Sequence, residues 1–315
     1  MSMIERRPIV PREDWLCWHR EHVTASVVAA LPAFNCHPFV TPLRLYVEKR
    51  GLEFPERDSA VMRRGRWFEP AIPKAIAERR HDWTIEAPDT YFCDPELRLG
   101  ATPDFLIFDD PRGLGVLQAK TVAPPVFERD WLGGTDIPRW IVLQIRLETM
   151  LTEAAFGVVG ALLVDAYNPE IALLEVPRDP IEEQAILAAN RQFWNDVADG
   201  KEPDPEFGKD SDLIRAMTPR EIPGTSIDVG HNNELPAMLE QRANLIARMD
   251  QDKARCKAIE DEIRFLMGDA EIALGLPDWK ITYRTSRVEG YTVKPREQRV
   301  LRIYDKRPLE QRPQS

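Results

Sequence analysis

The chain has 315 residues, of which 43% are hydrophobic and 30% are charged, and it carries a formal net charge of −10. This composition is that of an ordinary globular protein with room for one large core and an appendage, and it excludes a disordered chain. The acidic balance argues against a protein that coats nucleic acid indiscriminately. No apolar run approaches the roughly 20 residues that cross a bilayer.

The N-terminus is charged and lacks the apolar stretch of a secretory signal, so we expect a cytoplasmic protein. The cysteines are widely spaced and form no CxxC pair, which disfavours a zinc or iron–sulfur site. The five histidines form no HExxH motif. We interpret His19 and His22, which lie three residues apart, as surface groups.

Three helices are predicted in the first quarter of the chain. Apolar residues at helical spacing predict a helix over 14–30. A second helix over 41–51 ends at Gly51, and a third follows from about residue 59, interrupted by Pro70 and Pro73. From 90 to 122 the chain changes to short β-rich segments separated by turn residues, which predicts a meander of strands.

The next hundred residues alternate between helix and strand. An apolar stripe predicts a helix over 137–155 that packs on the sheet. Strands over 156–165 and 170–178 follow, and then a helix from about Pro180 to Ala198. This order predicts an α/β fold in which helices flank a mixed central sheet.

The last third of the chain has a different texture. Residues 203–233 are rich in Pro, Asp, Gly and Ser and predict a connector. Apolar residues from 238 to 266 recur at seven-residue intervals, which fits either a dimer-forming coiled coil or a long helix folded against the rest of the chain. A hairpin is expected over 279–294 with Gly290 near its turn, and 308–315 are expected to fray.

Three polar residues are expected to converge at one end of the strand meander. Alternate residues of a strand share a face, so Gln118 and Lys120 point one way while Leu117 and Ala119 point the other. Asp104 begins the preceding strand, and the turn at 109–115 favours antiparallel pairing of the two strands. Each residue alone has a structural explanation, as a turn aspartate, an edge lysine or a solvated amide.

A basic stretch precedes this region. Residues 61–80 hold six lysines and arginines and two glutamates, a local balance of +4. Such a stretch is either a patch that faces phosphates or a solvated helix face.

Taken together, the motifs resemble those of the PD-(D/E)xK nuclease superfamily, and more narrowly the YqaJ-like viral recombinase exonucleases, which are relatives of lambda exonuclease. The resemblance runs from about Arg20 to Pro203. It rests on RRGRWFEP, similar to a G-x-x-x-E-P element, on GATPD, on LQAK in place of an E-x-K, on Gln144 in the following helix, and on RQFWNDVADGKEPDP. It implies a restriction-endonuclease-like core, to which the long helix and the β-hairpin predicted after residue 234 are appended.

The resemblance also implies roles for the converging residues. Asp104 would be the principal ligand of Mg²⁺ or Mn²⁺, with Glu69 close by and the Ala119 carbonyl as a further oxygen. Lys120 would orient or activate the attacking water, and Gln144 would hold the nucleophile or the scissile phosphate.

Gln118 stands where the family has an acidic residue. Its amide oxygen can still coordinate Mg²⁺, but the negative charge is lost. A unit charge about 4 Å away is worth on the order of 4 kcal/mol at a surface-like dielectric. The resemblance therefore implies a metal ligand set of Asp104, Gln118, Ala119 and Glu69, which we expect to bind its cation more weakly than the family's set with an acidic residue in place of Gln118.

The DNA contacts implied by the resemblance lie further upstream. REHVTAS, from Arg20 to Ser26, is similar to a family segment whose arginine and serine hold the 5′-phosphate of a DNA end, although Thr24 and Ala25 replace its glycines. A salt bridge of Arg20 at a helix end is the alternative. The predicted phosphate-binding residues are Arg20, Ser26, Arg63, Arg64 and Arg66.

The resemblance implies a Mg²⁺-dependent DNA exonuclease that acts 5′ to 3′ on duplex ends in phage-type recombination or DNA repair. It further implies a single-strand annealing recombinase as partner and a homo-oligomer, a trimer in the lambda-type relatives. The alternatives are a structure-specific or restriction-like endonuclease and a catalytically weakened DNA-end-binding protein of the same fold. The expected division is a nuclease domain at 1–205, a linker at 206–233, a helical and hairpin region at 234–304 and a flexible tail at 305–315.

Overall fold

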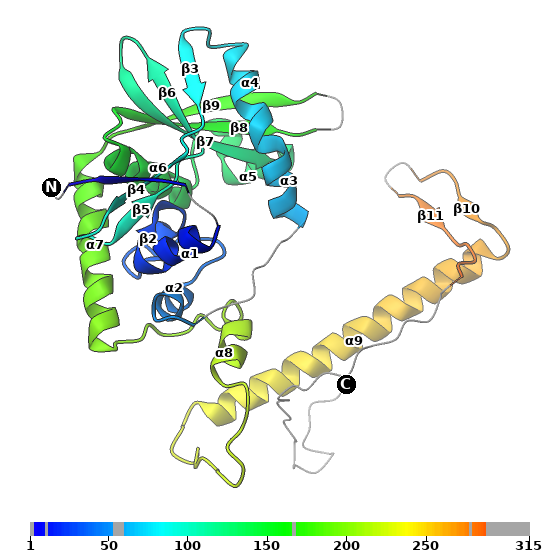
Figure 1. Cartoon of the computed structure of the whole chain (residues 1–315). Coiled ribbons are helices and arrows are strands. Elements are labelled where there is room, and N and C mark those ends of the chain that lie inside the picture. The colour runs from blue at the N-terminus through cyan, green and yellow to red at the C-terminus, as the bar shows by residue number, and fades with distance from the viewer. Residues whose placement is uncertain (1–2, 10–11, 53–59, 166–167, 277–278, 288–315) are drawn as a thin grey trace. The chain divides into compact units, whose positions relative to one another are not determined.

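The computed structural model describes residues 3–9, 12–52, 60–165, 168–276 and 279–287. The chain divides into two units, Met1–Ile214 and Arg215–Ser315, each of which is described by itself below. Figure 1 shows the elements of both units along the chain.

The first unit contains two mixed β-sheets. The larger sheet has five strands in the order β3-β6-β7-β8-β9, in which β7 and β8 are parallel and the other neighbours are antiparallel. Its strands are, in chain order, Trp83–Glu86, Phe105–Asp109, Gly113–Val122, Phe156–Leu163 and Glu170–Pro177.

The smaller sheet has four strands in the order β1-β4-β5-β2. They are Glu5–Pro8, Thr90–Asp94, Leu99–Ala101 and Val23–Thr24. The meander expected over 90–122 is therefore wrong as a single sheet, because β4 and β5 join β1 and β2 whereas β6 and β7 belong to the larger sheet.

Helices cover the larger sheet on both faces. α6 (Arg139–Thr152) contacts β7, β8 and β9 and also β4 and β5, so it lies between the two sheets, while α4 (Ile72–Ala77) packs on β3, β8 and β9 (Figure 1). Successive residues of β8 face opposite sides of the sheet: Val158 packs with Ile72 of α4, and Val159 packs with Ile141 of α6. The predicted α/β fold with a mixed sheet flanked by helices is confirmed.

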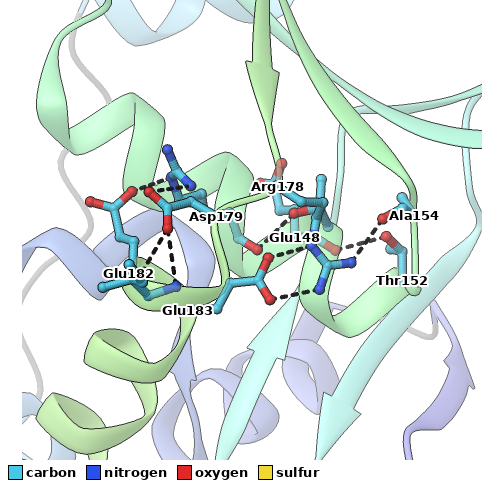
Figure 2. Close-up of polar contacts among 10 residues, drawn as sticks. Glu148, Thr152, Ala154, Arg178, Asp179, Glu182 and Glu183 are labelled. Atoms are coloured by element: carbon cyan, nitrogen blue, oxygen red, sulfur yellow. Dashed lines mark hydrogen bonds and ion pairs between the residues drawn. The ribbon is translucent and has the colours of Figure 1, made fainter.

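Ion pairs attach α7 (Pro180–Asp199) to its neighbours. The guanidinium of Arg178 is paired with Glu183 and also donates to the Ala154 carbonyl at 2.9 Å, as Figure 2 shows. Arg146 of α6 pairs with Glu182 in the first turn of α7. Asp179 caps the helix by accepting from the amides of the first turn. The predicted helix from about 180 to 198 is confirmed.

The N-terminal helices differ in part from the expectation. The helix predicted over 14–30 is wrong beyond residue 21: α1 is Arg12–Glu21, and Val23–Thr24 forms strand β2 beside β5 before the 3-10 helix η1, Ala25–Ala30. The second helix is confirmed as α2, Pro42–Lys49, capped by Thr41. The third is interrupted as predicted, into α3 (Ala60–Phe68), η2 (Glu69–Ala71) and α4.

The interpretation of His22 as a surface group is wrong. Its side chain is 3% exposed, and its Nδ1 shares a hydrogen bond of 3.0 Å with the Tyr91 hydroxyl of β4. Burial lowers the pKa of this imidazole, so the neutral ring is favoured. The ring of Trp18 stacks on Tyr91 with centroids 5.3 Å apart, which places this end of α1 against the smaller sheet.

The segment after residue 205 begins within the first unit. Asp210 is fully buried and accepts a hydrogen bond of 2.6 Å from the Thr41 hydroxyl, and Arg44 pairs with Asp212 at 2.7 Å. A short helix, α8 (Ser211–Met217), starts here, inside the stretch expected to be a linker. The expected domain limits at 205 and 233 stay predictions.

The second unit contains the long helix α9 (Leu235–Met267) and a two-stranded antiparallel pair, β10 (Ile272–Ala273) with β11 (Ile281–Thr282). The heptad stripe lies on α9, and the choice between a coiled coil and packing on the rest of the chain stays a prediction. Gly290 and the expected flexible tail lie outside the described residues. Across the described part of the chain, no helix is both long and apolar enough to span a bilayer.

The close packing of α6 on β8 can be tested at Gly157. A Cβ atom at this position would lie 2.1 Å from Cγ2 of Ile145, which is closer than packed atoms allow. Gly157→Ala should therefore lower the free energy of unfolding by about 1–3 kcal/mol in chemical denaturation. Gly65→Ala on α3 is the control, since no atom lies within 4 Å of its added Cβ. Equal stability of the two variants would contradict the packing.

Candidate active site

The site begins with the carboxylate of Asp104, which directly precedes β6. Its Oδ2 accepts a hydrogen bond of 2.8 Å from the backbone amide of Ala119 and another from the side-chain amide of Gln118. These bonds join the start of β6 to the middle of β7, where Phe105 pairs with Leu117. The predicted antiparallel pairing of the two strands is confirmed.

Gln118 is almost fully buried, with 3% of its surface exposed. Its Nε2 donates to Asp104, while its Oε1 is buried without a hydrogen-bond partner among the described residues. A buried carbonyl oxygen without a partner is costly, so this atom is available to a donor or a cation. Leu117 lies in the apolar cluster on the opposite face, with Ile72 and Ile76.

Lys120 shares the face of Gln118 and extends toward α6. Its Nζ donates to Oε1 of Gln144 at 3.4 Å, a long hydrogen bond. The same nitrogen lies 5.3 Å from the centre of the Trp140 ring, within the range of a cation–π contact. Of the three residues expected to converge, Asp104 and Gln118 are hydrogen-bonded to each other, and Lys120 is hydrogen-bonded to Gln144.

Glu148 is a site residue that the sequence interpretation missed. It lies one turn after Gln144, accepts a hydrogen bond of 2.9 Å from Nε2 of that amide, and is 1% exposed. Its second oxygen, Oε2, is buried without a partner among the described residues. The signal was a glutamine and a glutamate at i and i+4 on a helix whose neighbouring positions are apolar.

Glu69 reaches the same group of residues from η2, which contacts β7. Burial raises the pKa of its carboxyl group, the charge of Asp104 raises it further, and Lys120 lowers it. Burial also raises the pKa of Asp104, against the effect of Lys120 and the two hydrogen bonds. The pKa of Glu148 is raised by burial and by the charge of Asp104. All three carboxyl groups thus interact with the ammonium group of Lys120, and their raised pKa values favour the protonated forms.

Ser26 and Thr24 lie on η1 and β2, with a hydrogen bond of 3.1 Å between their hydroxyl groups. The backbone of Ser26 is hydrogen-bonded to His37. Burial lowers the pKa of that imidazole, and the charge of Lys120 lowers it further. Ser26 is therefore connected to the Lys120 side of the site through His37, which is a second residue that the sequence interpretation missed.

The remaining predicted phosphate ligands lie on separate helices. Arg20 is in the last turn of α1. Arg63, Arg64 and Arg66 lie on α3, which contacts β7 and leads directly into Glu69. The Nε atom of Arg64 is buried without a hydrogen-bond partner among the residues that the structure describes. The role of these four arginines in phosphate binding stays a prediction.

A site for Mg²⁺ must supply hard oxygen ligands. In the described ranges of the chain, no group of three or more His, Cys, Asp or Glu side chains is arranged to hold a metal ion. The unpartnered Oε1 of Gln118 next to the Asp104 carboxylate is nevertheless an oxygen pair of the required kind. The residues present fit a weakly held divalent cation.

The chain is similar to several proteins of known structure. The alkaline exonuclease LHK-Exo from Laribacter hongkongensis is 17% identical over 60% of this chain and 93% of its own, with a TM-score of 0.48. Its complex with dAMP gives 18% identity, the same coverage and the same TM-score. A phage-related exonuclease from Haemophilus somnus is 10% identical over 57% of this chain and 96% of its own, with a TM-score of 0.39.

No curated protein matches the sequence significantly. A family model does, that of the YqaJ-like viral recombinase domain, and the match covers residues 14–155. This range runs from within α1 to just past the end of α6 and therefore includes Glu69, Asp104, Gln118, Lys120 and Gln144. Residues 14–155 are thus similar to the YqaJ-like viral recombinase domain.

Proposed function

We propose that the protein is a divalent-metal-dependent DNA exonuclease that degrades duplex ends from 5′ to 3′ in phage-type recombination or DNA repair. The observation that supports it best is the bonding of Asp104 to Gln118 and Ala119, directly beside Lys120. The YqaJ-like family of the domain supports the same activity. Double-stranded DNA ends are the proposed substrate, and a single-strand annealing recombinase the proposed partner.

The cation would be held by Asp104, Oε1 of Gln118, the carbonyl of Ala119 and Glu69. The carboxyl groups of Asp104 and Glu69 have raised pKa values. A bound divalent ion would lower these pKa values by supplying positive charge. Mg²⁺ or Mn²⁺ would offset the charge that develops on the phosphate oxygens during phosphoryl transfer.

Lys120 and Gln144 would place the scissile phosphate. The ammonium group of Lys120 has three donors, of which one is directed at Oε1 of Gln144 and the others remain for phosphate oxygens or water. Glu148 fixes the orientation of this amide, because its carboxylate accepts from Nε2 and so leaves Oε1 facing Lys120. Positioning and electrostatic stabilisation are the main tasks of a protein in phosphoryl transfer.

Gln118 determines the net charge of the site. As an amide it donates to the Asp104 carboxylate, whereas a glutamate at this position would place two carboxylates side by side. The cation-free site is therefore more stable with the amide, and the cation is bound with one negative charge fewer. The proposal therefore predicts an active enzyme that needs a high concentration of the divalent cation.

Phosphates further along the strand would contact the basic residues outside this group. Ser26, connected to Lys120 through His37, and Arg20 are the proposed ligands of a 5′-phosphate. Arg63, Arg64 and Arg66 on α3 are proposed to contact the DNA backbone, because α3 leads into Glu69. A homo-oligomer would keep such an enzyme on its substrate.

The direct test uses linear duplex DNA with a 5′-phosphate on one strand only, incubated with purified protein with and without Mg²⁺ or Mn²⁺. Metal-dependent release of nucleotides from the phosphorylated strand is expected. Circular duplex should stay intact, and its cleavage would instead identify an endonuclease. Binding of DNA ends without any degradation, in either metal, would identify a DNA-end-binding protein.

Asp104→Ala should reduce nucleotide release at least about a hundredfold, because it removes the carboxylate that joins β6 to Ala119 and would hold the cation. The matched control is Asp110→Asn in the turn at the other end of the same hairpin, where the side chain is exposed. Circular dichroism should show that both variants are folded. Undiminished activity of the Asp104 variant would rule out catalysis at this site.

Gln118→Glu should lower the Mg²⁺ concentration for half-maximal activity about tenfold or more, since a gain of 1.4 kcal/mol in binding is a factor of ten. The variant should also melt at a lower temperature than the wild type in EDTA, because the hydrogen bond to Asp104 is replaced by repulsion between carboxylates. Added Mg²⁺ should reverse the order. A melting temperature that responds to Mg²⁺ equally in both proteins would contradict the proposed ligand set.

Glu148→Gln should make stability less dependent on pH. Because the folded chain raises the pKa of Glu148, it binds that proton more tightly than the unfolded chain does, so stability is lost as the pH rises above the ordinary value of 4.5. The difference in unfolding free energy in favour of Glu148→Gln should grow with pH by at least about 1.4 kcal/mol, the equivalent of one pKa unit. Urea denaturation across pH 5–8, with Glu170→Gln on β9 as control, measures it.

A further inference from the structure

A row of aromatic rings leads from the protein surface to Lys120. Phe39 and His37 have ring centroids 6.1 Å apart, and His37 and Trp140 have centroids 5.8 Å apart, both edge-on. The Lys120 ammonium lies 5.3 Å from the Trp140 ring. At the outer end, the Phe39 side chain is 81% exposed.

The backbone around Phe39 is held in place by hydrogen bonds. Nδ1 of His37 accepts from the amides of Phe39 at 3.2 Å and Val40 at 2.8 Å. The amides of Cys36 and His37 both donate to the Ala29 carbonyl of η1, at 2.9 and 3.2 Å. Val40 packs against the core of the unit. Phe39 is therefore presented to solvent by a fixed loop, which lowers the entropy that a ligand must overcome on binding it.

Single apolar side chains on a protein surface are common and need no functional explanation. Phe39 differs because ring contacts through His37 and Trp140 connect it to Lys120. The rings beyond it stay uncharged near neutral pH, since burial lowers the pKa of His37 to about 4. The row thus places neutral aromatic rings next to the Lys120 cation. Proteins that bind single-stranded nucleic acid use this combination, because bases stack on aromatic rings and phosphates pair with cations.

We propose that Phe39, supported by His37 and Trp140, is a stacking subsite for a nucleobase of the DNA strand whose phosphate lies at Lys120. This inference rests on the proposed function, in which Lys120 contacts the scissile phosphate. The row has three steps of at most 6.1 Å, and successive nucleotides of a strand rise about 3.4 Å, so the stacked base lies within about five nucleotides of that phosphate. Because every base has an aromatic face, the subsite is indifferent to sequence.

The test places the fluorescent base 2-aminopurine, one position at a time, at the first five nucleotides of a 5′-phosphorylated strand. Full-length protein is added in EDTA, where metal-dependent hydrolysis cannot proceed, and again with Ca²⁺. Stacking on Phe39 should quench the fluorescence at one or two adjacent positions. Phe39→Ala should abolish this quenching and weaken binding about fivefold to 150-fold.

Two further variants separate stacking from other effects. Phe39→Trp should retain the position-specific quenching, whereas Phe39→Leu, which is apolar but not aromatic, should lose it. Phe108→Ala, which truncates a partly exposed ring at the far end of β6, should leave quenching unchanged. Quenching that is the same in wild type and Phe39→Ala, or absent at all five positions in both conditions, would overturn the subsite.

The same experiment keeps the two proposals apart. If the wild type degrades DNA in Mg²⁺ but Phe39→Ala changes neither quenching nor binding, the subsite is wrong and the nuclease stands. If quenching is position-specific and depends on Phe39 but no metal supports degradation, the subsite stands and the proposed exonuclease is wrong.

Discussion

The bonding of the Asp104 carboxylate to β7 is the interaction on which the candidate site depends. One oxygen accepts from the Ala119 backbone and from the Gln118 side chain, so the start of β6 and the middle of β7 keep a fixed relation. Hydrogen bonds to a charged acceptor are about twice as strong as neutral ones. Every other group of the site is placed relative to this junction: Lys120 follows it on β7, and Glu69 approaches it from η2.

The position of α6 between two sheets explains how the site keeps buried polar groups on one helix. Both sides of α6 are packed, by β7, β8 and β9 and by β4 and β5. Gln144 and Glu148 are thereby held in a common orientation with little room for alternative rotamers. In this arrangement one oxygen of Gln118 and one of Glu148 are buried without a hydrogen-bond partner among the described residues, which is unfavourable for stability. Such buried polar atoms are expected where a site binds a ligand or an ion.

The parts that the sequence predicted correctly are those with a strong local pattern. The turn at 109–115 and the alternation along 116–120 were enough to bring Asp104 beside Gln118. Regular apolar spacing identified α6, and Pro180 in the first turn identified α7. The split of 90–122 between two sheets depends on β1 and β2, strands of four and two residues, which are too short to have a pattern of their own. Glu148 was missed although its bond to Gln144 is local, because its burial depends on the packing of α6. His37 was missed because its contact with Trp140 is made only after distant segments pack.

The hydrogen bond from Thr41 to Asp210 ties the front of α2 to a segment about 170 residues downstream in the chain. Thr41 comes two residues after Phe39, so this long-range bond also closes the base of the loop in which that ring lies. A gene fragment ended at residue 205 would lack Asp210 and Asp212, the carboxylates that accept from Thr41 and Arg44. Residues 210 to 212 therefore belong with the first unit.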